Sequence, residues 1–358
     1  MNIVLSFLAL LVSTTVCLAA VQGRRDMFED AGVGDGLDNH LGIGENCVAS
    51  NLDSLWEIFK TTYSKVYSTS TEPRRREIFE NNVVKIVDHN LEHDLGMHTY
   101  RMGINEFADL TNDEFKRQMN GYRGVKVRNS TRTFSKIADI NLPNNLDWRD
   151  IGIVTGVKNQ QQCGSCWAFA AIASLESHQA QKTRQLGTLS EQNLVDCSGP
   201  EGNMGCDGGR TDLAFDYIIE NGGIENDISY PYTGQDGTCY YREECSAATC
   251  EGFVDIPIGD EEALQQAVAE EGPVSVAIDA SQEKFQFYKA GVFSETQCSS
   301  EELNHGVLVI GYGTEDGNDY WLGKNSWGVS WGEKGFMKMS RNQNNQCGIA
   351  TEAIYPLV

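Results

Sequence analysis

The stretch Gln160-Gln-Gln-Cys-Gly-Ser-Cys-Trp-Ala-Phe169 decides the fold of this chain of 358 residues. Small and apolar residues from Cys166 to Lys182 predict a buried helix that begins at the second cysteine. A Cys-x-x-Cys pair is a redox pair in a βαβ unit, half of a zinc site, or a nucleophile beside a structural disulfide partner. The flanking pattern is not a thioredoxin-like βαβ unit, and no second Cys or His pair lies at short spacing. These observations favour the third interpretation, in which the nucleophilic thiol requires a base.

The number of cysteines isolates one thiol. The chain has eleven, of which Cys17 and Cys47 lie in the N-terminal leader. The remaining nine are an odd number, which in an oxidising compartment leaves one free thiol or one intermolecular bond. Eleven cysteines are unusual for a cytosolic chain of this length and ordinary for a secreted one.

A cysteine nucleophile requires a base, and beyond Leu142 the chain offers two histidines. His178 lies twelve residues after Cys166 on the same predicted helix, so roughly 18 Å separates them, which is too far for proton transfer. His305 remains, in Leu-Asn-His-Gly before a predicted strand. An isolated histidine is more often structural, but the odd thiol favours His305 as the base. Asn325, in Lys-Asn-Ser-Trp-Gly, is the candidate to orient its ring.

The hydrophobic pattern divides the chain into a helical N-terminal part and a mixed C-terminal part. Between Leu52 and Glu92, two helices are expected to meet near Pro73. After Leu142, helices are predicted at 166–182, 191–197, 211–220 and 260–270, and strands at 274–278, 307–312, 320–322 and 336–339. Helices early and strands late predict an α+β protein in two lobes.

Charge is distributed unevenly. The net charge is −23, which argues against a main role in binding nucleic acid or an anionic membrane. Up to Asn141 there are 16 basic and 19 acidic residues, a net of −3, whereas from Leu142 onward 12 basic and 32 acidic residues give −20. Residues 130–141 are polar and aperiodic, as in an exposed linker that proteases cut. We therefore place a boundary between 141 and 142.

The N-terminal sequence is typical of a targeting segment. An uncharged apolar run from Ile3 to Val16 is followed by Ala19 and Ala20 and then by a polar segment. This predicts a secretory signal peptide over residues 1–20, although no basic residue precedes the run, and the alternative is a signal anchor. Residues 21–51 are rich in Gly, Asp and Asn and are expected to form a flexible leader.

The ordered motifs resemble those of the papain family of cysteine proteases, in particular its cathepsin L branch. The Cys-Gly-Ser-Cys-Trp signature precedes the family's His and Asn by about 130–150 residues. His305 follows Cys166 by 139 residues and Asn325 follows it by 159. Further matching stretches are Leu189–Cys197, Gly205–Gly209, His305–Gly313 and Lys324–Gly328, and in the leader the interspersed Arg75, Phe79, Asn82, Ile86 and Asn90 together with Gly103–Asp109. In the leader, Thr71 stands at the first Glu position of the motif, and Glu72 follows one residue late.

The resemblance implies a papain-like two-lobed fold and assigns roles. It implies a helical lobe and a β-barrel-like lobe with an active-site cleft between them, preceded by a helical inhibitory propeptide over 52–141, with the mature protease at 142–358. Cys166 would be the nucleophile, His305 its base, Asn325 the orienting residue and Gln160 an oxyanion donor. Helix-dipole stabilisation would favour a Cys166 thiolate. Substrate-binding positions would be Gly208, Gly209, Arg210, Thr211, Ala277, Leu303, Asn304, Gly306, Trp327 and Glu352.

The same resemblance implies three disulfides. These are Cys163–Cys206, Cys197–Cys239 and Cys298–Cys347. Cys245 and Cys250 are additional to the common pattern and are expected to pair with each other, although Cys239 lies near enough to leave this open.

Glu352 would give the specificity pocket a carboxylate. By the resemblance, this residue lies at the base of the pocket for the second residue before the scissile bond. A carboxylate there would accept a basic side chain, so we expect the pocket to accept both apolar residues and arginine. The alternative is that Glu352 faces solvent or pairs with Arg210.

The resemblance also implies partners and a route of activation. Substrates would be proteins or peptides, the propeptide would act as an intramolecular inhibitor, and cystatin-type proteins would inhibit a monomeric mature enzyme. No metal, cofactor or nucleic acid is expected. From Asp53 to Lys136 the net charge is +2 against −20 in the mature part, which predicts self-processing near Leu142 at acid pH; the alternative is removal by another protease. Asn129, in the sequon Asn-Ser-Thr, predicts a glycan on the propeptide, and the destination would be lysosomal or extracellular.

Two other classes of function make different predictions. A thiol oxidoreductase would use Cys163 and Cys166 and would not need His305. A catalytically inactive binding protein would lack part of the set Cys166, His305, Asn325 and Gln160, which this sequence retains.

Overall fold

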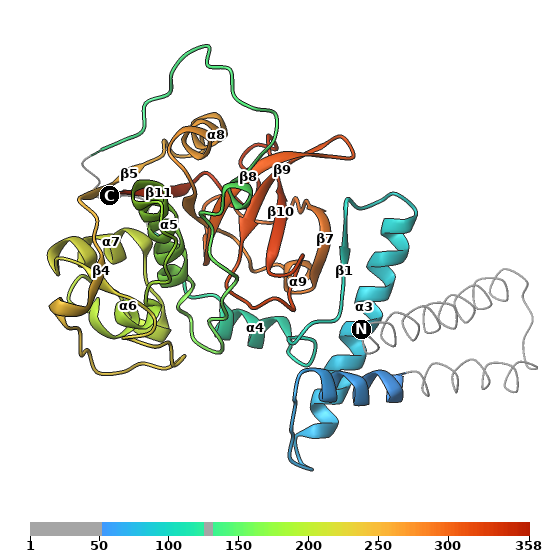
Figure 1. The fold of residues 1–358 in the computed structure, drawn as a ribbon. Coiled ribbons are helices and arrows are strands. Elements are labelled where there is room, and N and C mark those ends of the chain that lie inside the picture. The colour runs from blue at the N-terminus through green and yellow to red at the C-terminus, as the bar shows by residue number, and fades with distance from the viewer. Residues whose placement is uncertain (1–51, 125–131) are drawn as a thin grey trace, which may run out of the picture. The chain divides into compact units, whose positions relative to one another are not determined.

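The structure is a computed structural model that describes residues 52–124 and 132–358. The predicted signal peptide, the leader, Cys47 and Asn129 lie outside these residues. The described chain forms two compact units (Figure 1). Unit 1 contains residues 52–95 and Ile104–Thr111, and unit 2 contains Gly96–Gly103 with the described residues from Asn112 to Val358. Part of the predicted propeptide segment is therefore built into unit 2.

Unit 1 consists of two helices and a short segment packed on them. A helix over residues 52–62 precedes α3 (Glu72–Asp94), which has Pro73 in its first turn, as predicted. Trp56, Phe59 and Phe79 form the core, and the Phe59 and Phe79 ring centroids lie 4.7 Å apart. This spacing is typical of tilted aromatic pairs that contribute beyond the area they bury.

Polar residues of the interspersed motif bind the segment Ile104–Thr111 to the two helices of unit 1. The buried Asn82 donates its side-chain amide to the carbonyls of Ala108 and Leu110, at 2.9 and 3.0 Å. Asp109 accepts hydrogen bonds from Lys65 and Tyr67 at 2.9 and 2.7 Å.

The shifted glutamate of the motif still makes a helix contact. Trp56 Nε1 lies 3.2 Å and Lys60 Nζ 2.6 Å from Glu72 Oε1. Glu72 thus ties the second helix of unit 1 to the first.

Unit 2 is built on a nine-stranded sheet of order β1-β7-β10-β9-β8-β6-β11-β5, with β2 paired to β8. The strands are β1 (Tyr100–Met102), β2 (Leu146–Asp147), β5 (Gly252–Asp255), β6 (Val274–Ile278), β7 (Tyr288–Phe293), β8 (His305–Glu315), β9 (Asn318–Lys324), β10 (Phe336–Ser340) and β11 (Glu352–Leu357). A separate pair joins β3 (Ile224–Glu225) and β4 (Ser246–Ala248). All four predicted strands are confirmed, whereas β1, β2, β5, β7 and β11 were not anticipated.

Four helices of unit 2 match the predicted ranges closely, whereas α4 (Asn112–Met119) and the short α9 (Glu283–Gln286) were not predicted. The four are α5 (Cys166–Thr183), α6 (Glu191–Cys197), α7 (Thr211–Glu220) and α8 (Glu261–Glu270), and single turns lie at Trp148–Ile151, Gly205–Asp207, Glu243–Cys245 and Gln346–Gly348. Helix α5 is buried over most of its length, as expected for a helix that is apolar on nearly every face. Helices α5, α6 and α7 gather on one side of unit 2, and strands β7 to β10 form the other side (Figure 1). These are the two predicted lobes.

Both ends of the sheet are paired with segments that precede residue 142. β1 runs antiparallel to β7 at one end. At the other end, Thr133 forms a parallel bridge with Asp255 of β5. A free edge strand exposes unpaired backbone groups, so these segments close the two edges.

Three disulfides confirm three predicted pairs: Cys163–Cys206, Cys197–Cys239 and Cys298–Cys347. The prediction that Cys245 pairs with Cys250 is wrong, because both cysteines are free. Strand β4 separates them. Three extended residues span roughly 10 Å, which exceeds the limit of about 7 Å between the Cα atoms of a disulfide.

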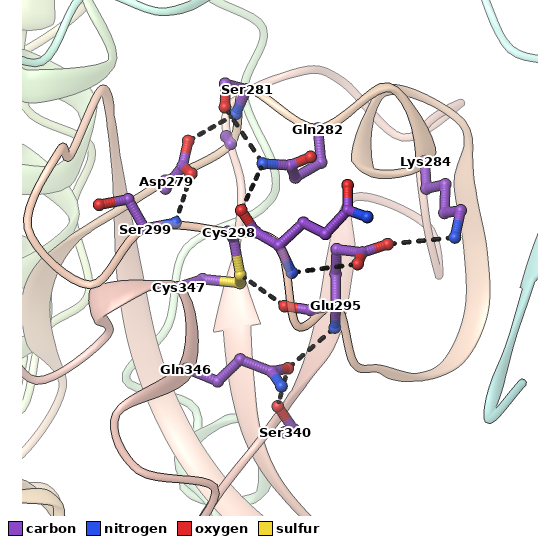
Figure 2. The surroundings of a disulfide bond; sticks show 12 residues. Asp279, Ser281, Gln282, Lys284, Glu295, Cys298, Ser299, Ser340, Gln346 and Cys347 are labelled. Carbon is purple, nitrogen blue, oxygen red and sulfur yellow. Dashed lines mark hydrogen bonds and ion pairs between the residues drawn. A yellow bond between two sulfur atoms is a disulfide. The ribbon is translucent and has the colours of Figure 1, made fainter.

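The disulfide Cys298–Cys347 anchors the loop that leads into β8 (Figure 2). In this loop, Glu295 N–H donates to Gln346 Oε1 at 2.9 Å, and Lys284 Nζ lies 3.2 Å from the Glu295 carboxylate. Asp279 accepts Ser299 N–H at 2.8 Å (Figure 2). Asp279 also accepts the Asn304 side-chain amide at 2.7 Å. The network therefore fixes the residue directly before His305.

No helix within residues 52–124 and 132–358 has the length and hydrophobicity that a membrane crossing requires.

Candidate active site

Cys166 begins α5 and is fully buried. Ser165 is the N-cap but makes no side-chain capping bond, so it is available for other contacts. A Cβ added to Gly306 of β8 would lie 3.1 Å from the Cys166 carbonyl oxygen and 3.3 Å from Ala170 Cβ. The glycine therefore lets the first turn of α5 approach the start of β8, where His305 lies.

Strand pairing brings His305 and Asn325 together. His305 begins β8 opposite Ile278 of β6, and Asn325 follows the last residue of β9, Lys324, which pairs with Leu308. His305 Nε2 lies 2.8 Å from Asn325 Oδ1. That oxygen also accepts the Ser326 N–H at 2.8 Å, so Nε2 is the donor and carries the ring proton.

The other imidazole nitrogen is available as a base. His305 Nδ1 is buried and has no hydrogen-bond partner among the described residues. The fully buried Trp327 packs on the ring, with centroids 4.4 Å apart, and so shields the bond to Asn325 from water. The predicted orienting role of Asn325 thus has matching geometry.

Burial holds both reacting groups in their neutral forms. Desolvation raises the pKa of the Cys166 thiol, although backbone groups of Gly306 and Gly121 oppose this. Desolvation also lowers the pKa of His305 to about 4, against the opposing effect of Asn325. The helix-dipole argument for a thiolate is therefore outweighed while the site is covered.

Gln160 is held by residues on three sides. Its Nε2 donates to the Met119 and Cys163 carbonyls, both at 2.9 Å, and its Oε1 accepts the Ser326 hydroxyl at 2.6 Å. The Ser326 contact fixes which end of the amide faces the site, so the donor end points toward Met119.

Tyr232 links Gln160 to Ser165, the residue directly before Cys166. Its hydroxyl donates to the Gln160 carbonyl at 2.7 Å and lies 2.8 Å from Ser165 Oγ. Its ring packs edge-on against Phe169 of α5 at 5.0 Å. No sequence motif singles out Tyr232; Ser326, by contrast, is part of the Lys-Asn-Ser-Trp-Gly stretch.

The segment from Met119 to Gly124 covers the site. Gly209 N–H donates to the Gly121 carbonyl at 2.9 Å, and Arg123 N–H donates to the Gly209 carbonyl at 3.0 Å. Tyr122 and Gly209 form a parallel bridge, and Tyr122 N–H donates to the Asn304 carbonyl at 3.0 Å. A Cβ on Gly121 would lie 1.8 Å from the Gly164 carbonyl oxygen, so this position passes the nucleophile loop only as glycine.

Glu352, the predicted base of the specificity pocket, contacts the covering segment. It is buried, pairs across the sheet with Ala277, and accepts the Tyr122 hydroxyl at 3.0 Å. Arg210 instead donates to Asp212, with Nε 3.0 Å from Oδ1. With the covering segment in place, Glu352 is therefore buried, and Arg210 pairs with Asp212.

Most of the remaining predicted substrate-binding residues surround the same segment. Gly209 and Asn304 bond to its backbone, Leu303 and Thr211 are buried nearby, and Gly208 has a positive φ of 115° before Gly209. The Arg210 side chain, paired with Asp212, is occupied outside the pocket.

Two observations remove the alternatives for Cys163 and His178. Cys163 is bonded to Cys206 and not to Cys166, so the redox pair is not formed. His178 lies within α5, where its Nε2 is 3.1 Å from the Pro273 carbonyl oxygen and its ring stacks on Tyr355. Its burial lowers its pKa to about 4, as for His305, so position separates the two histidines.

Tyr232→Phe is expected to lower kcat by roughly 3- to 10-fold, because the change removes two hydrogen bonds worth about 1 kcal/mol each and loosens Gln160, a predicted oxyanion donor, and Ser165, which precedes Cys166. KM should stay nearly unchanged. Steady-state hydrolysis of a peptide substrate measures both constants. Tyr240→Phe, on the neighbouring ring stacked with Tyr230, is the control. Equal effects of the two changes would contradict a positioning role.

Comparisons with known proteins agree with this geometry. Residues 142–357 match the papain family cysteine protease domain, and residues 56–115 match the cathepsin propeptide inhibitor domain (I29). The chain is 51% identical over 314 residues to a cathepsin L-like peptidase of Aedes aegypti, covering 85% of this chain and 92% of that protein. It is 50% identical over 308 residues to cathepsin S of Mus musculus, covering 85% and 90%. The solved digestive procathepsin L 3 of the Tenebrio molitor larval midgut superposes with a TM-score of 0.81 at 43% identity, covering 86% of this chain and 99% of that one.

The nucleophile at a helix start, the oriented histidine and these matches define a class. The chain belongs to the papain family of cysteine proteases. Within that family it is a cathepsin L-like protease that carries its propeptide inhibitor domain.

Proposed function

We propose that the chain is a secreted zymogen of a cysteine endopeptidase that cleaves peptide bonds through an acyl-enzyme on Cys166. The observation that carries this proposal is the Met119 carbonyl, which lies 2.9 Å from Gln160 Nε2. A carbonyl oxygen already occupies the place where the oxyanion of a substrate would be stabilised. Removing this segment would leave the same donor for a scissile bond.

In the proposed reaction, His305 acts first as a base and then as an acid. His305 Nδ1 takes the Cys166 proton, and the thiolate attacks the scissile carbonyl carbon. Gln160 Nε2 and the Cys166 backbone N–H donate to the oxyanion. Collapse breaks the C–N bond, and His305 returns its proton to the leaving amine. Water, deprotonated by His305, then hydrolyses the thioester and releases the carboxylic acid and the thiol.

The covering segment supports inhibition by the propeptide. It pairs with Gly209 in parallel, places Tyr122 on Glu352 and buries the reacting groups. Opening the site would allow the proton to pass from Cys166 to His305. That transfer moves a proton without taking one up, so by itself it makes activation no more favourable at acid pH.

We therefore assign the acid dependence to carboxylates that hold the propeptide. Lys136 Nζ lies 2.8 Å from Asp260 Oδ2. Burial alone would raise the pKa of Asp260, but Lys136 and the Ala263 N–H outweigh burial, and the pKa is lowered. A carboxylate with a lowered folded-state pKa stabilises the contact above its unfolded value of about 3.9, and this contribution is lost as the pH falls through the folded value.

Self-processing near Leu142 is accordingly expected to accelerate on acidification, with the steepest rise below about pH 4. Intact mass spectrometry of the precursor held between neutral and acid pH measures this. An epoxysuccinyl thiol probe added after processing should label one peptide, which contains Cys166. A processing rate independent of pH would contradict acid activation, and absence of labelling would contradict the protease itself.

Glu352→Gln is expected to reduce cleavage of substrates with arginine at the second position before the scissile bond, relative to those with phenylalanine there, by about tenfold or more, because a charge-assisted hydrogen bond is lost. The carboxylate accepts the Tyr122 hydroxyl in the covered site, so it points into the position a side chain occupies. Matched peptide substrates that differ only in this residue give the ratio of kcat/KM. Asp212→Asn, which removes the partner of Arg210, is the control. An unchanged ratio for Glu352→Gln would contradict dual specificity.

For localisation and partners we propose the secretory pathway, with a lysosomal or extracellular destination, protein or peptide substrates, inhibition by cystatin-type proteins and a monomeric mature enzyme. The disulfides support an oxidising compartment, since such bonds persist there.

A further inference from the structure

The segment from Arg132 to Ile137, here named the tail, lies on the edge of β5. Phe134 N–H donates to the Asp255 carbonyl at 2.8 Å, and Asp255 N–H donates to the Arg132 carbonyl at 3.0 Å. β5 ends the order of the main sheet, so the tail adds one more extended segment to it. Backbone pairing at a sheet edge is a general way to bind an extended peptide of variable sequence.

A side chain of α8 extends this pairing by one residue. Gln266 Oε1 accepts Ile137 N–H at 2.7 Å, and Gln266 Nε2 donates to the Ile137 carbonyl at 3.0 Å. One primary amide thus satisfies both backbone groups of one residue, as a neighbouring strand would. Gln266 is only 3% exposed with the tail in place.

Two side chains of the tail add selectivity. Phe134 is buried. Lys136 Nζ lies 2.8 Å from Asp260 and 3.1 Å from Glu262. The Glu262 side chain is 85% exposed, and exposed ion pairs are weak and screened by salt, so Asp260, at 27% exposed, is the main partner of the lysine.

These four residues, Asp255, Asp260, Glu262 and Gln266, lie in the part of the chain that the papain family domain covers, whereas the tail precedes that domain. Cleavage near Leu142 would separate the two and leave the edge without its covalent occupant. We propose that this edge is a peptide-binding site separate from the catalytic centre. It keeps the excised tail bound and accepts extended peptides with the order aromatic, any residue, basic, apolar.

This inference rests on the proposed function only for the excision step, so the first experiment avoids excision. Hydrogen exchange is measured on the full chain carrying Cys166→Ala. Adding Gln266→Ala should accelerate exchange of the Phe134, Ile137 and Asp255 amides by about tenfold or more, because their shared pairing loosens. The Gly209 amide, bonded to Gly121, should be unaffected.

The matched control is Gln265→Ala, the neighbouring residue of α8, whose side chain accepts Arg341 instead. It should leave the three amides unchanged. Equal acceleration by both variants, or no acceleration by Gln266→Ala, would overturn the proposed clamp.

The second experiment uses the processed enzyme with Cys166 blocked by an epoxysuccinyl inhibitor. A synthetic peptide of residues Arg132–Ile140 should restore protection of the Asp255 amide in a saturable manner. The same peptide with Lys136→Glu should bind more weakly by roughly threefold at low salt, as expected for an exposed pair. If the wild-type peptide restores no protection, the edge holds the tail only within the intact chain, and the proposal fails. Failure of the proposed function would show earlier, as absence of labelling by the inhibitor.

Discussion

Cys166→Ala is expected to lower peptide hydrolysis by roughly 10⁴-fold or more and to leave the precursor unprocessed at acid pH, because no other group can form the acyl-enzyme. Fold and stability should change little, since alanine fits a helix start in a buried position. Active-site titration with the thiol probe and intact mass spectrometry measure the two losses.

Cys250→Ala is the matched control for this change. Cys250 is also a buried free thiol, and burial raises its pKa to about 12. Its Sγ lies 3.9 Å from the Phe215 carbonyl oxygen, and neither His305 nor Gln160 is among its contacts. Full activity of Cys250→Ala, together with inactivity of Cys166→Ala, would show that activity depends on the position of Cys166 and not on a buried thiol as such. Residual hydrolysis by Cys166→Ala above the background of uncatalysed cleavage would contradict the assigned nucleophile.

Gln160→Ala is expected to lower kcat by about 10²- to 10³-fold, the usual effect of removing one preorganised oxyanion donor. The effect should fall on kcat more than on KM, because the donor bonds to charge that develops only in the transition state. The propeptide should also bind less tightly, since the bond from Gln160 to Met119 is lost. Steady-state kinetics on the processed enzyme and inhibition by added propeptide measure both effects.

Gln192→Ala tests whether any buried glutamine gives this result. Gln192 donates to Asp196 and to the Gln235 carbonyl, and it is as buried as Gln160. Its loss should reduce stability and leave kcat within a few-fold of the original. A loss of less than about tenfold for Gln160→Ala would mean that the carbonyl oxygen of a substrate is not held by this donor.

Much of the site could be predicted from the residues alone. The odd cysteine count predicted one thiol outside the disulfides, whereas Cys166, Cys245 and Cys250 are all free. Helix geometry excluded His178, which the structure places on α5 beside Tyr355. The same residues left Asn325 as the orienting group, and its 2.8 Å bond to His305 agrees. These conclusions depend on short-range geometry and on counting, which a sequence states directly.

Other features could not be predicted because they depend on contacts between distant residues. Tyr232 lies 72 residues from Gln160, and nothing in its neighbourhood marks it. Glu352 meets Tyr122 across 230 residues. The error over Cys245 and Cys250 has a related cause: nearness in sequence favours a bond, but an extended strand holds the two thiols apart.

The sequence by itself determined the family and the helices and strands with strong periodicity, and it predicted Cys166 as the nucleophile, His305 as its base and Gln160 as an oxyanion donor. These properties are encoded locally, in motifs and in hydrophobic spacing. Only the tertiary structure showed that the Met119 carbonyl accepts a hydrogen bond from Gln160, that Glu352 accepts one from Tyr122, and that the tail pairs with the edge of β5. Each of these depends on strand register and on burial. Both arise when the whole chain packs, because the free energy of desolvating a polar group is set by residues far away in sequence.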